Sequence, residues 1–336
     1  MVTFNRKDLL LQCISMLAGQ SRPLDAIYVI DNGSTDGTVS LLAQHGFISE
    51  RPEKENAFFQ NHARIDTGAA ANRKVDLYYV QFPENMGGTY GFSEGMKRAC
   101  EDGYDWIWLM DDDSHPHSDA LKAMSPFLTS ADTAAVAPAV KGPDDALSLT
   151  HRGMLHCKHI FPRFQTPLEE GLYLQESVPI DSASFVGLLM RGSSVREAGY
   201  PKGEFFLNHD DIEYCLRLSK TGNILLVPAS IMYHAEEMKR NCKTTRIFGK
   251  NVCRPPYNEL WLRYFGFRNL IWLGRRYIRP RALFYMEAFF YYFVQILLVI
   301  RYDGKKLKRI RFFTNALKDG LQGIFDNEKP KRLLYE

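Results

Sequence analysis

Cysteine pairs, a charge of one sign and a leader peptide are all lacking in this sequence. Its six cysteines include no C-x-x-C pair, a pattern that favours reduced thiols over a disulfide framework or a zinc site. The 42 basic and 39 acidic residues leave a net charge of only +3, so we expect no nucleic-acid partner. The first residues, MVTFNR, lack the basic and apolar regions of a secretory signal, and we therefore expect a cytoplasmic protein.

Long apolar runs are scarce too, and only the segment 282–300 approaches the length of a membrane span. It carries Glu287 and Gln295, and a charge in mid-segment costs roughly 2.5 to 3.5 kcal/mol in a bilayer. Basic residues flank it on both sides, which favours a helix lying on an anionic surface, at the inner face of the plasma membrane. A buried core helix explains the same pattern, and a true span is the less favoured alternative.

Strand and helix patterns alternate over the first half of the chain. Short β-branched runs predict strands at 2–4, 26–30, 77–82 and 106–110, and helical spacing predicts helices at 8–18, 35–44 and 91–101. This alternation predicts an α/β fold, Rossmann-like, with a mostly parallel sheet flanked by helices. Residues 51–73 lack a clear period and are predicted to form a loop excursion, and 138–179 to be irregular with strand fragments. A strand at 184–191, a helix at 210–218 and a strand at 224–227 follow.

The character of the chain changes after residue 257. From there the sequence is aromatic, basic and helical in its spacing. We therefore predict two parts: a catalytic domain over 1–257, and a helical C-terminal region over 258–336 that associates with a membrane or a partner.

Three consecutive carboxylates, Asp111 to Asp113, directly follow the apolar stretch WIWLM. In α/β sheets of this kind ligands bind beyond the carboxyl ends of the strands. Adjacent carboxylates repel one another, and a hard divalent cation such as Mg²⁺ or Mn²⁺ is the usual reason to tolerate them. Such an ion also neutralises a departing diphosphate. A helix N-cap with acidic residues in its first turn explains an isolated DDD equally well.

Further motifs favour the metal site over the helix N-cap, because they occur in a recognisable order. The sequence contains VTFNR, DNGSTDGT, ENMGGTYGF, MDDD and FFLNHDDIEYCLRL, with a histidine later at 234. Together they resemble the large inverting glycosyltransferase family two with the GT-A fold, over roughly residues 2 to 240. Within that family the chain is similar to galactofuranosyltransferases, and rhamnosyltransferases are the closest competitor.

The resemblance implies a role for each motif. It assigns the nucleotide sugar to Thr3, Asn5, Arg6, Asp31, Asn85, Gly87, Gly88 and Asp112. It assigns the metal, Mn²⁺ or Mg²⁺, to Asp111, Asp113 and His234. Tyr90 departs from the family pattern, in which a smaller residue is commoner, and a larger side chain there would narrow the donor pocket.

The resemblance also places the proton transfer on the helix at 210–218. Asp210 is the expected general base, because an inverting transfer needs a carboxylate to take the proton of the attacking hydroxyl. His209, Asp211 and Glu213 are expected to contact the acceptor. The alternative is that these carboxylates serve only the dipole of their helix.

The implied enzyme is a metal-dependent inverting glycosyltransferase. It would transfer galactofuranose from UDP-galactofuranose to a hydroxyl of a growing bacterial surface glycan, either free or lipid-linked. A rhamnosyltransferase that uses dTDP-rhamnose is one alternative, and a non-catalytic assembly subunit that retained the fold is another. The first strand is short for this family, so we expect either a true start upstream of Met1 or a few missing residues.

Overall fold

The computed structural model describes residues 1–48, 58–66, 74–156, 158–160, 164–235, 243–247 and 250–336. The chain divides into two compact units. The first consists of Met1–Met154, Pro167–Gly203 and Asp211–Glu237, and the second of Leu155–Thr166, Glu204–Asp210 and Met238–Glu336. The division into domains at 257/258 stays a prediction.

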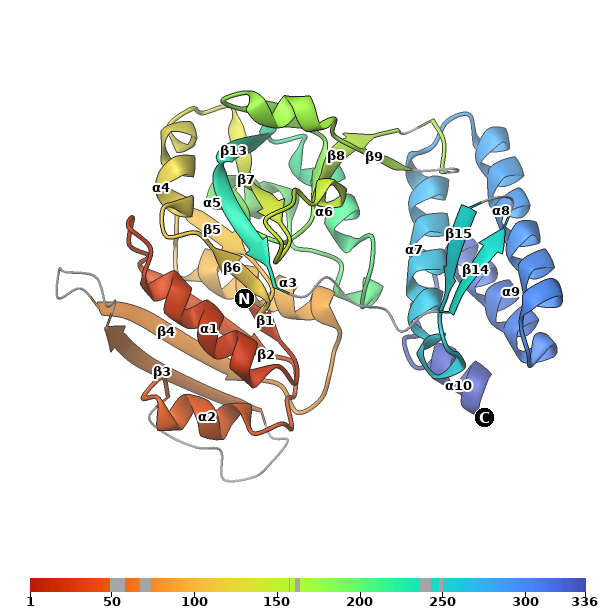
Figure 1. The fold of residues 1–336 in the computed structure, drawn as a ribbon, viewed down its shortest axis with the longest axis horizontal. Helices are drawn as coiled ribbons and strands as arrows, with labels where there is room; N and C mark the ends of the chain where they lie inside the picture. Colours follow the sequence, from red (N-terminus) through yellow and green to blue (C-terminus); the bar gives the residue numbers. More distant parts are fainter. Residues whose placement is uncertain (49–57, 67–73, 157, 161–163, 236–242, 248–249) are drawn as a thin grey trace. The chain divides into compact units, whose positions relative to one another are not determined.

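A four-stranded sheet with the order β1-β2-β4-β3 begins the first unit (Figure 1). Its parallel strands are β1 (Val2–Thr3), β2 (Ala26–Asp31) and β4 (Lys74–Gln81), and β3 (Phe59–Asp66) runs antiparallel at the edge. The connecting helices are α1 (Lys7–Ala18), α2 (Thr38–Gln44) and α3 (Gly88–Glu101). These helices and the three parallel strands confirm the predicted alternation.

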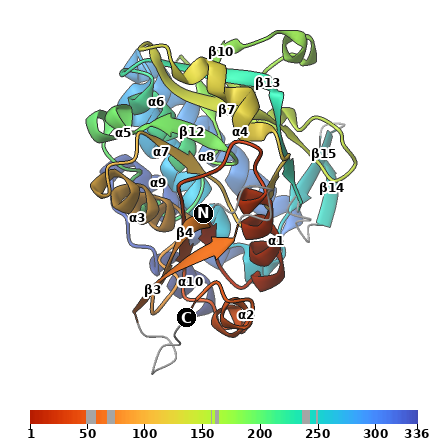
Figure 2. The same cartoon turned by 90° about the vertical axis from the view of Figure 1, so that its left-hand side faces the viewer.

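Helices cover both faces of this sheet because the strand side chains alternate (Figure 2). Leu10 and Ile14 of α1 share a buried cluster with Val29, Leu77 and other side chains of one face. Phe92 and Met96 of α3 belong to a second cluster, with side chains of the opposite face such as Ile30 and Val80. Alternate apolar residues of β2 and β4 therefore serve two cores at once.

The prediction of a loop over 51–73 was wrong for β3, while 51–57 and 67–73 lie outside the described residues. The strand pairs along its whole length with β4. It has a period of two, but Asn61 and Ala63 stand on its more buried side, and this weakens the apolar signal.

A larger sheet, with the order β10-β13-β7-β12-β5 and with β6 also paired to β13, completes the first unit. Its strands are β5 (Trp106–Leu109), β6 (Ser114–Pro116), β7 (Thr133–Lys141), β10 (Val178–Ile180), β12 (Leu188–Arg191) and β13 (Asn223–His234). Only the pair β7–β13 is parallel. Val2 N donates to Met110 O at 3.2 Å, and Val2 and Asp111 form a parallel bridge, so β1 joins the two sheets. The α/β fold is confirmed, with mixed rather than mostly parallel sheets.

Shorter elements connect these strands. They are β8 (Arg152–Leu155), β9 (Gln165–Pro167), β11 (Ser182–Ala183), α4 (Ala120–Met124), α5 (Gly192–Ala198), α6 (Asp210–Leu218) and the 3-10 turns Ser125–Leu128, Leu149–His151, Glu170–Leu174, Gly203–Phe205 and Tyr257–Glu259. The start and end of α6 match the predicted helix. β7 was missed in part because its sequence, TAAVAPAVK, has small buried residues and a proline in place of an alternating pattern.

The second unit contains the predicted C-terminal helices. They are α7 (Leu262–Tyr277), α8 (Arg281–Tyr302), α9 (Lys306–Gln322) and α10 (Lys329–Tyr335), and β14 (Lys243–Ile247) pairs antiparallel with β15 (Lys250–Arg254). Gly320 of α9 permits close packing on α7, because a Cβ there would lie 2.6 Å from Arg268 O. Among the described residues, α8 alone is long and apolar enough to cross a membrane by length and composition.

Candidate active site

The last residue of β1, Thr3, and Arg6 in the loop after it bind the acidic triplet that follows β5. The Thr3 hydroxyl donates to Asp112 Oδ2 at 2.7 Å, and both residues are buried. Arg6 Nη1 lies 2.6 Å from Asp113 Oδ2 and 3.4 Å from Asp112 Oδ1. These contacts exist because β1 and β5 are neighbours and their carboxyl ends meet, as the strand-end rule predicts.

His234 reaches the same cluster from the far end of β13. The short strand β6 turns back from the triplet and pairs antiparallel with β13, which sets His234 opposite Ser114. Ala235 N then donates to Asp113 O at 2.8 Å. His234 Nε2 lies 3.3 Å from Asp113 Oδ1. The structure therefore brings together five of the residues expected at the metal and nucleotide (Thr3, Arg6, Asp112, Asp113 and His234).

The three carboxyl groups of the triplet differ in their electrostatics. Burial, together with the neighbouring carboxylates, raises the pKa of Asp111 to about 7. Burial also raises the pKa of Asp112 to about 6, although bonds from Thr3 and Arg6 oppose the shift. For Asp113, burial is outweighed by His234 and Arg6, and its pKa is lowered. His234 responds in the opposite sense: burial would lower its pKa, but Asp113 raises it.

Two atoms of this cluster are candidate ligands of a divalent cation. Asp113 Oδ1 and His234 Nδ1 are both buried without a hydrogen-bond partner. Asp113 Oδ1, whose neighbour is His234 Nε2 at 3.3 Å, and the second nitrogen of that imidazole, Nδ1, together with the Asp111 carboxyl of raised pKa, suit Mn²⁺ or Mg²⁺ in chemistry. Over the part of the chain that the structure describes, no three His, Cys, Asp or Glu residues are already arranged as a ligand set. The ligand roles of Asp111, Asp113 and His234 therefore stay predictions.

Asp31, expected at the base of the nucleotide, is fully buried at the end of β2. Its Oδ1 accepts from Ser34 N at 2.8 Å, and its Oδ2 accepts from the Tyr79 hydroxyl. Burial raises its pKa, and these two bonds oppose the shift. One oxygen thus holds the turn after β2 and the other binds β4, and contact with the nucleotide remains a prediction.

The loop after β2 and the loop after β4 are held close together. Gly33 has a φ of +80°, and a Cβ there would lie 2.9 Å from backbone atoms of Glu84, so only glycine fits. Asn32 Oδ1 accepts from Met86 N at 3.0 Å across the same contact. The loop after β2 and the loop after β4 therefore form one continuous surface at the strand ends.

The remaining residues expected at the nucleotide shape these loops. Asn5 has a φ of 54°, its N donates to Ser34 Oγ at 2.9 Å, and its Oδ1 accepts from Thr35 N at 2.7 Å. Asn85 Oδ1 accepts from Gly87 N at 2.8 Å, and α3 begins at Gly88. The first N–H groups of a helix have no partner within the helix, so the start of α3 is of the kind that suits an anion such as a phosphate.

The helix α6 carries the residues expected at the proton transfer and the acceptor. Asp210 opens the helix, and Asp211 Oδ1 accepts from Ile212 N at 2.7 Å. Glu213 is 1% exposed and accepts from Arg217 Nη2 at 2.7 Å, an ion pair within the helix. The structure thus gives Glu213 an internal partner, and its contact with an acceptor stays a prediction.

The segment before α6, in the second unit, has an unusual backbone. Phe206, Asn208 and His209 all have φ values between 62° and 67°, which non-glycine residues rarely adopt. Asn269 Nδ2, from α7, donates to the carbonyls of Phe205, Leu207 and Asn208 at 2.9 to 3.1 Å. Burial lowers the pKa of His209 to about 4, and a bond to the Gly266 backbone opposes this shift. α7 therefore fixes the conformation of the segment that leads into Asp210.

Arg268, the neighbour of Asn269, supports the same segment. It is 0% exposed, and its Nη2 donates to Glu204 O at 3.2 Å and Phe205 O at 3.1 Å. Sequence reasoning missed this pair, because an arginine and an asparagine carry no signal in a helix that also contains Arg263, Arg275 and Arg276.

Sequence reasoning also missed His151, which lies beside His234, and its neighbour Arg152. The rings of His151 and His234 have centroids 5.3 Å apart, and burial, helped by Arg152, lowers the pKa of His151 to about 3. Arg152 is 0% exposed and donates to the carbonyls of Pro138 and Val186 at 2.9 and 2.7 Å. A short histidine–arginine pair in an irregular stretch carries no motif that could have revealed them.

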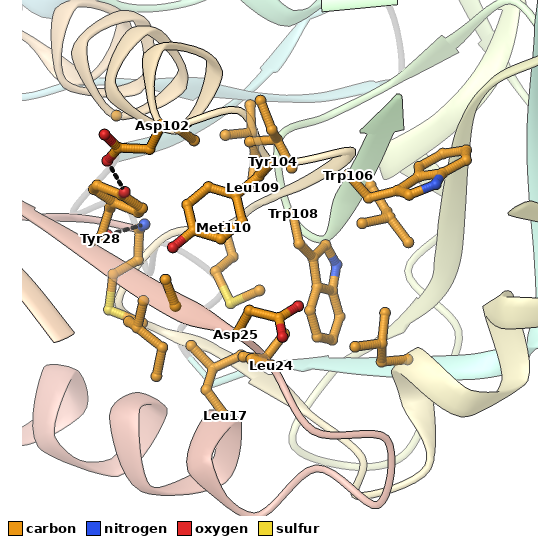
Figure 3. A pocket seen from close by; sticks show the side chains of 18 of the residues that line it. Leu17, Leu24, Asp25, Tyr28, Asp102, Tyr104, Trp106, Trp108, Leu109 and Met110 are labelled. Carbon is orange, nitrogen blue, oxygen red and sulfur yellow. Dashed lines mark hydrogen bonds between the residues drawn. The ribbon is translucent and has the colours of Figure 1, made fainter. Parts of the chain in front are cut away.

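A cavity of about 480 Å³ lies in the first unit, and Met110, which directly precedes the acidic triplet, is one of its lining residues (Figure 3). It runs along β2 and β5, where β1 pairs with only two residues of β2. Aromatic side chains such as Tyr28, Trp106 and Trp108 line it. The Met1 amino group donates to Tyr28 O at 2.7 Å, and burial lowers its pKa to about 6. None of the residues expected at the donor or the metal lines this cavity.

Comparison with known proteins bears on what this site does. A family model described as glycosyl transferase family 2 matches residues 1–61, and one described as glycosyltransferase like family 2 matches residues 62–248, which is more than half of the chain. Galactofuranosyltransferase GlfT1 of Mycobacterium tuberculosis is 29% identical over 227 residues, which cover 66% of this chain. The chain spans 64% of the length of that relative.

Two further proteins are similar to the chain. The dTDP-rhamnosyl transferase RfbF of Shigella flexneri is 24% identical over 236 residues, which cover 68% of this chain and 73% of that protein. The crystal structure of S. aureus TarS 1-349 in complex with UDP matches with a TM-score of 0.53 and 12% identity, over 99% of this chain and 81% of that one. The likeness to TarS confirms the predicted GT-A fold.

Proposed function

The chain belongs to glycosyltransferase family 2, and on this premise we propose that it is a metal-dependent, inverting galactofuranosyltransferase. The observation that carries the proposal is the buried cluster in which Thr3, Arg6 and His234 meet the triplet Asp111 to Asp113. Such a set of carboxylates at the carboxyl ends of strands suits a divalent cation, which would in turn hold the diphosphate of a nucleotide sugar. The likeness to GlfT1 supports galactofuranose as the sugar.

Asp111, Asp113 and His234 would hold Mn²⁺ or Mg²⁺, which when bound neutralises the charge of the leaving diphosphate. Arg6 contributes a fixed positive charge, because its guanidinium is held by Asp112 and Asp113. Asp112 orients Arg6 and ties β1 to the triplet through Thr3.

The nucleotide would lie on the surface formed by the loops after β2 and β4. Thr3, Asn5 and Asp31 are expected near the base, and Asn85, Gly87 and Gly88 near the ribose and phosphates. Backbone N–H groups at the start of α3 can donate to phosphate oxygens. The structurally similar TarS was crystallised in complex with UDP, which supports a uridine nucleotide here.

The chemical step we propose is a single displacement. The acceptor hydroxyl attacks the anomeric carbon, the bond from that carbon to the diphosphate oxygen breaks, and the hydroxyl proton moves to the Asp210 carboxylate. Inversion follows from attack on the face opposite the leaving group. His209 and Asp211 would contact the acceptor, and Glu213 would do so only if it released Arg217.

The test of this function is the variant Asp210→Asn. We expect UDP release in the presence of UDP-galactofuranose, Mn²⁺ and a galactofuranose-containing acceptor to fall at least a hundredfold, with unchanged affinity for UDP. Asp66→Asn is the matched control, because Asp66 is exposed on the edge strand β3, and it should retain full activity. Normal turnover by Asp210→Asn would refute the assignment of the base.

The likeness to RfbF supports a second candidate, a rhamnosyltransferase that uses dTDP-rhamnose. A thermal-shift screen separates the two candidates. Stabilisation by UDP and not by dTDP supports the proposal, and the reverse result would replace it.

The acceptor we propose is a growing bacterial surface glycan, free or lipid-linked, at the cytoplasmic face of the plasma membrane. The alternative from another class is a non-catalytic assembly subunit. A strain in which Asp111→Ala and Asp113→Ala are combined should lose the glycan, whereas normal glycan in that strain would favour the assembly subunit.

A further inference from the structure

One face of α8 exposes apolar side chains to solvent along its length. Met286, Phe289, Phe290, Phe293, Leu297 and Ile300 form this face, which we term the outer stripe, and they are 48% to 64% exposed. At 100° per residue all six lie within about 100° around the helix axis, Phe289 and Phe290 being at the two sides of the stripe. Scattered exposed apolar residues are ordinary, but a continuous stripe of aromatic and aliphatic side chains marks an interaction surface.

The opposite face of α8 is packed within the second unit, so the helix is anchored there. Phe284, Ala288 and Val299 are fully buried. Tyr291 stacks on Phe267 of α7 with ring centroids 5.1 Å apart, and the Tyr292 hydroxyl lies 2.8 Å from Thr314 Oγ1 of α9. A helix held along one side by protein presents only its other side to a partner.

The charge within α8 also favours a helix that lies along a surface. Glu287 is its only acidic residue, and its carboxylate accepts from Ile160 N at 2.8 Å and lies 2.5 Å from His159 Nδ1. The Glu287 side chain is 13% exposed and stands to the side of the outer stripe. The stripe itself carries no acidic group that would repel an anionic surface.

Basic residues surround the ends of the helix. The segment 279–311 contains eight basic and two acidic residues, a net charge of +6. One of the two acidic residues is Glu287, and the other, Asp303, forms ion pairs with Arg254 and Arg309. Arg301, Lys306 and Arg311 are exposed, and so is Leu307 of the first turn of α9, at 84%. An apolar stripe with cationic ends is complementary to anionic headgroups above acyl chains.

We infer that α8 lies in the plane of an anionic lipid bilayer, with the outer stripe inserted among the acyl chains and the basic residues at its ends on the headgroups. The inference deepens the membrane location in the proposed function, but it does not depend on the donor sugar. It places the enzyme where a lipid-linked acceptor would be found.

Co-sedimentation with vesicles tests the inference on the full chain. We expect binding to vesicles of phosphatidylglycerol and phosphatidylcholine, and at least a tenfold lower partition coefficient for the combined variant Phe289→Gln, Phe293→Gln and Leu297→Gln. The matched control replaces three exposed apolar residues of the first unit, Phe58→Gln, Met154→Gln and Leu174→Gln, and should bind as the wild type does.

Further experiments separate the electrostatic part of vesicle binding from the apolar part. Pure phosphatidylcholine vesicles, or the combined variant Arg301→Gln, Lys306→Gln and Arg311→Gln, should give several-fold weaker binding that added salt weakens no further. Equal binding to neutral and anionic vesicles would overturn the inference, as would equal binding by the stripe variant. Self-association without lipid that the stripe variant abolishes, together with no vesicle binding, would overturn it too and identify a second copy as the partner.

Two controls keep the result interpretable. If the triple variant does not fold, the single variants Phe293→Gln and Leu297→Gln, each expected to lower the partition coefficient about threefold, replace it. Stabilisation by UDP should be the same in the wild type and the stripe variant. A stripe variant that loses vesicle binding but keeps UDP binding therefore tests the membrane inference and not the proposed function. A protein that binds vesicles but is inactive would contradict the proposed function and leave the membrane inference standing.

Discussion

The substitution Asn269→Leu tests whether α7 sets the conformation of the segment that leads into Asp210. Leucine has nearly the shape of asparagine, but it cannot donate to the carbonyls of Phe205, Leu207 and Asn208. Phe205 O would still accept from Arg268, so two carbonyls lose this donor. An unsatisfied buried acceptor costs about 1 to 3 kcal/mol, and we expect a loss of about 2 to 3 kcal/mol in the stability of this segment.

The backbone of the segment adds to this effect. Phe206, Asn208 and His209 have positive φ values that the surrounding contacts must enforce, at a cost of order 1 kcal/mol or more each. Without Asn269 the segment can relax toward negative φ, which moves the start of α6. At 1.4 kcal/mol for each factor of ten, kcat should fall about 10- to 100-fold.

The assay measures three quantities for each variant: kcat from UDP release, Kd for UDP by calorimetry, and Tm. We expect Asn269→Leu to lower kcat and to leave Kd for UDP within threefold, because its contacts lie at the segment before Asp210. Asn315→Leu is the matched control, since the Asn315 amide donates to Arg311 O on an exposed face of α9. A lower Tm with unchanged kcat would refute the positioning role, and so would a parallel loss of UDP affinity.

Three further predictions concern pH, metal and the cavity beside β1. Burial lowers the pKa of His209 to about 4, whereas its pKa in the unfolded chain is about 6.5. The folded state therefore favours the neutral imidazole, and its full stability is present above pH 6.5. As the pH falls from 6.5 to 4, up to about 3 kcal/mol of that stability is lost. His209→Asn, which tolerates positive φ, should therefore lose less Tm between pH 7 and 5 than the wild type does. Millimolar Mn²⁺ should raise the Tm of the wild type by a few degrees but not that of Asp111→Asn combined with Asp113→Asn, and equal shifts would contradict these ligands. Four valine-rich residues added before Met1 should pair with β2 and β5 in the cavity and raise Tm by several degrees in thermal unfolding, whereas four Gly-Ser residues should not.

The parts of the fold and site that the sequence predicts are those set by local pattern. Strands β2, β4 and β5 are short apolar runs, and polar motifs follow each of them directly. The rule that ligands bind at the carboxyl ends of strands then places Arg6 near Asp112 and Asp113, as observed. The prediction of the GT-A fold rested on the order of the motifs, since periodicity alone predicts only a parallel α/β sheet.

The parts that the sequence does not predict depend on pairing between distant segments. β7 contributes buried alanines and a proline, and only its neighbours β12 and β13 make it a strand. His151 lies beside His234, although nothing in its own stretch indicates this position. Asn269 stands in α7 among aromatic, aliphatic and basic residues, and its three carbonyl partners become visible only when the segment before α6 is in place.

In the structure the three carboxylates of the DDD motif have different contacts, although the motif alone gives no reason to distinguish them. Successive side chains of the triplet point in different directions, so each meets a different set of neighbours. Asp112 has donors on both oxygens, from Thr3 and Arg6, and therefore acts as a link between β1 and β5. Asp113 accepts from Arg6 on one oxygen and turns the other toward His234. Asp111 has its pKa raised to about 7 by burial and by the other two carboxylates. Because a cation bound at Asp111 would relieve this repulsion while Asp112 keeps its donors, the first and third positions are the ones suited to a metal.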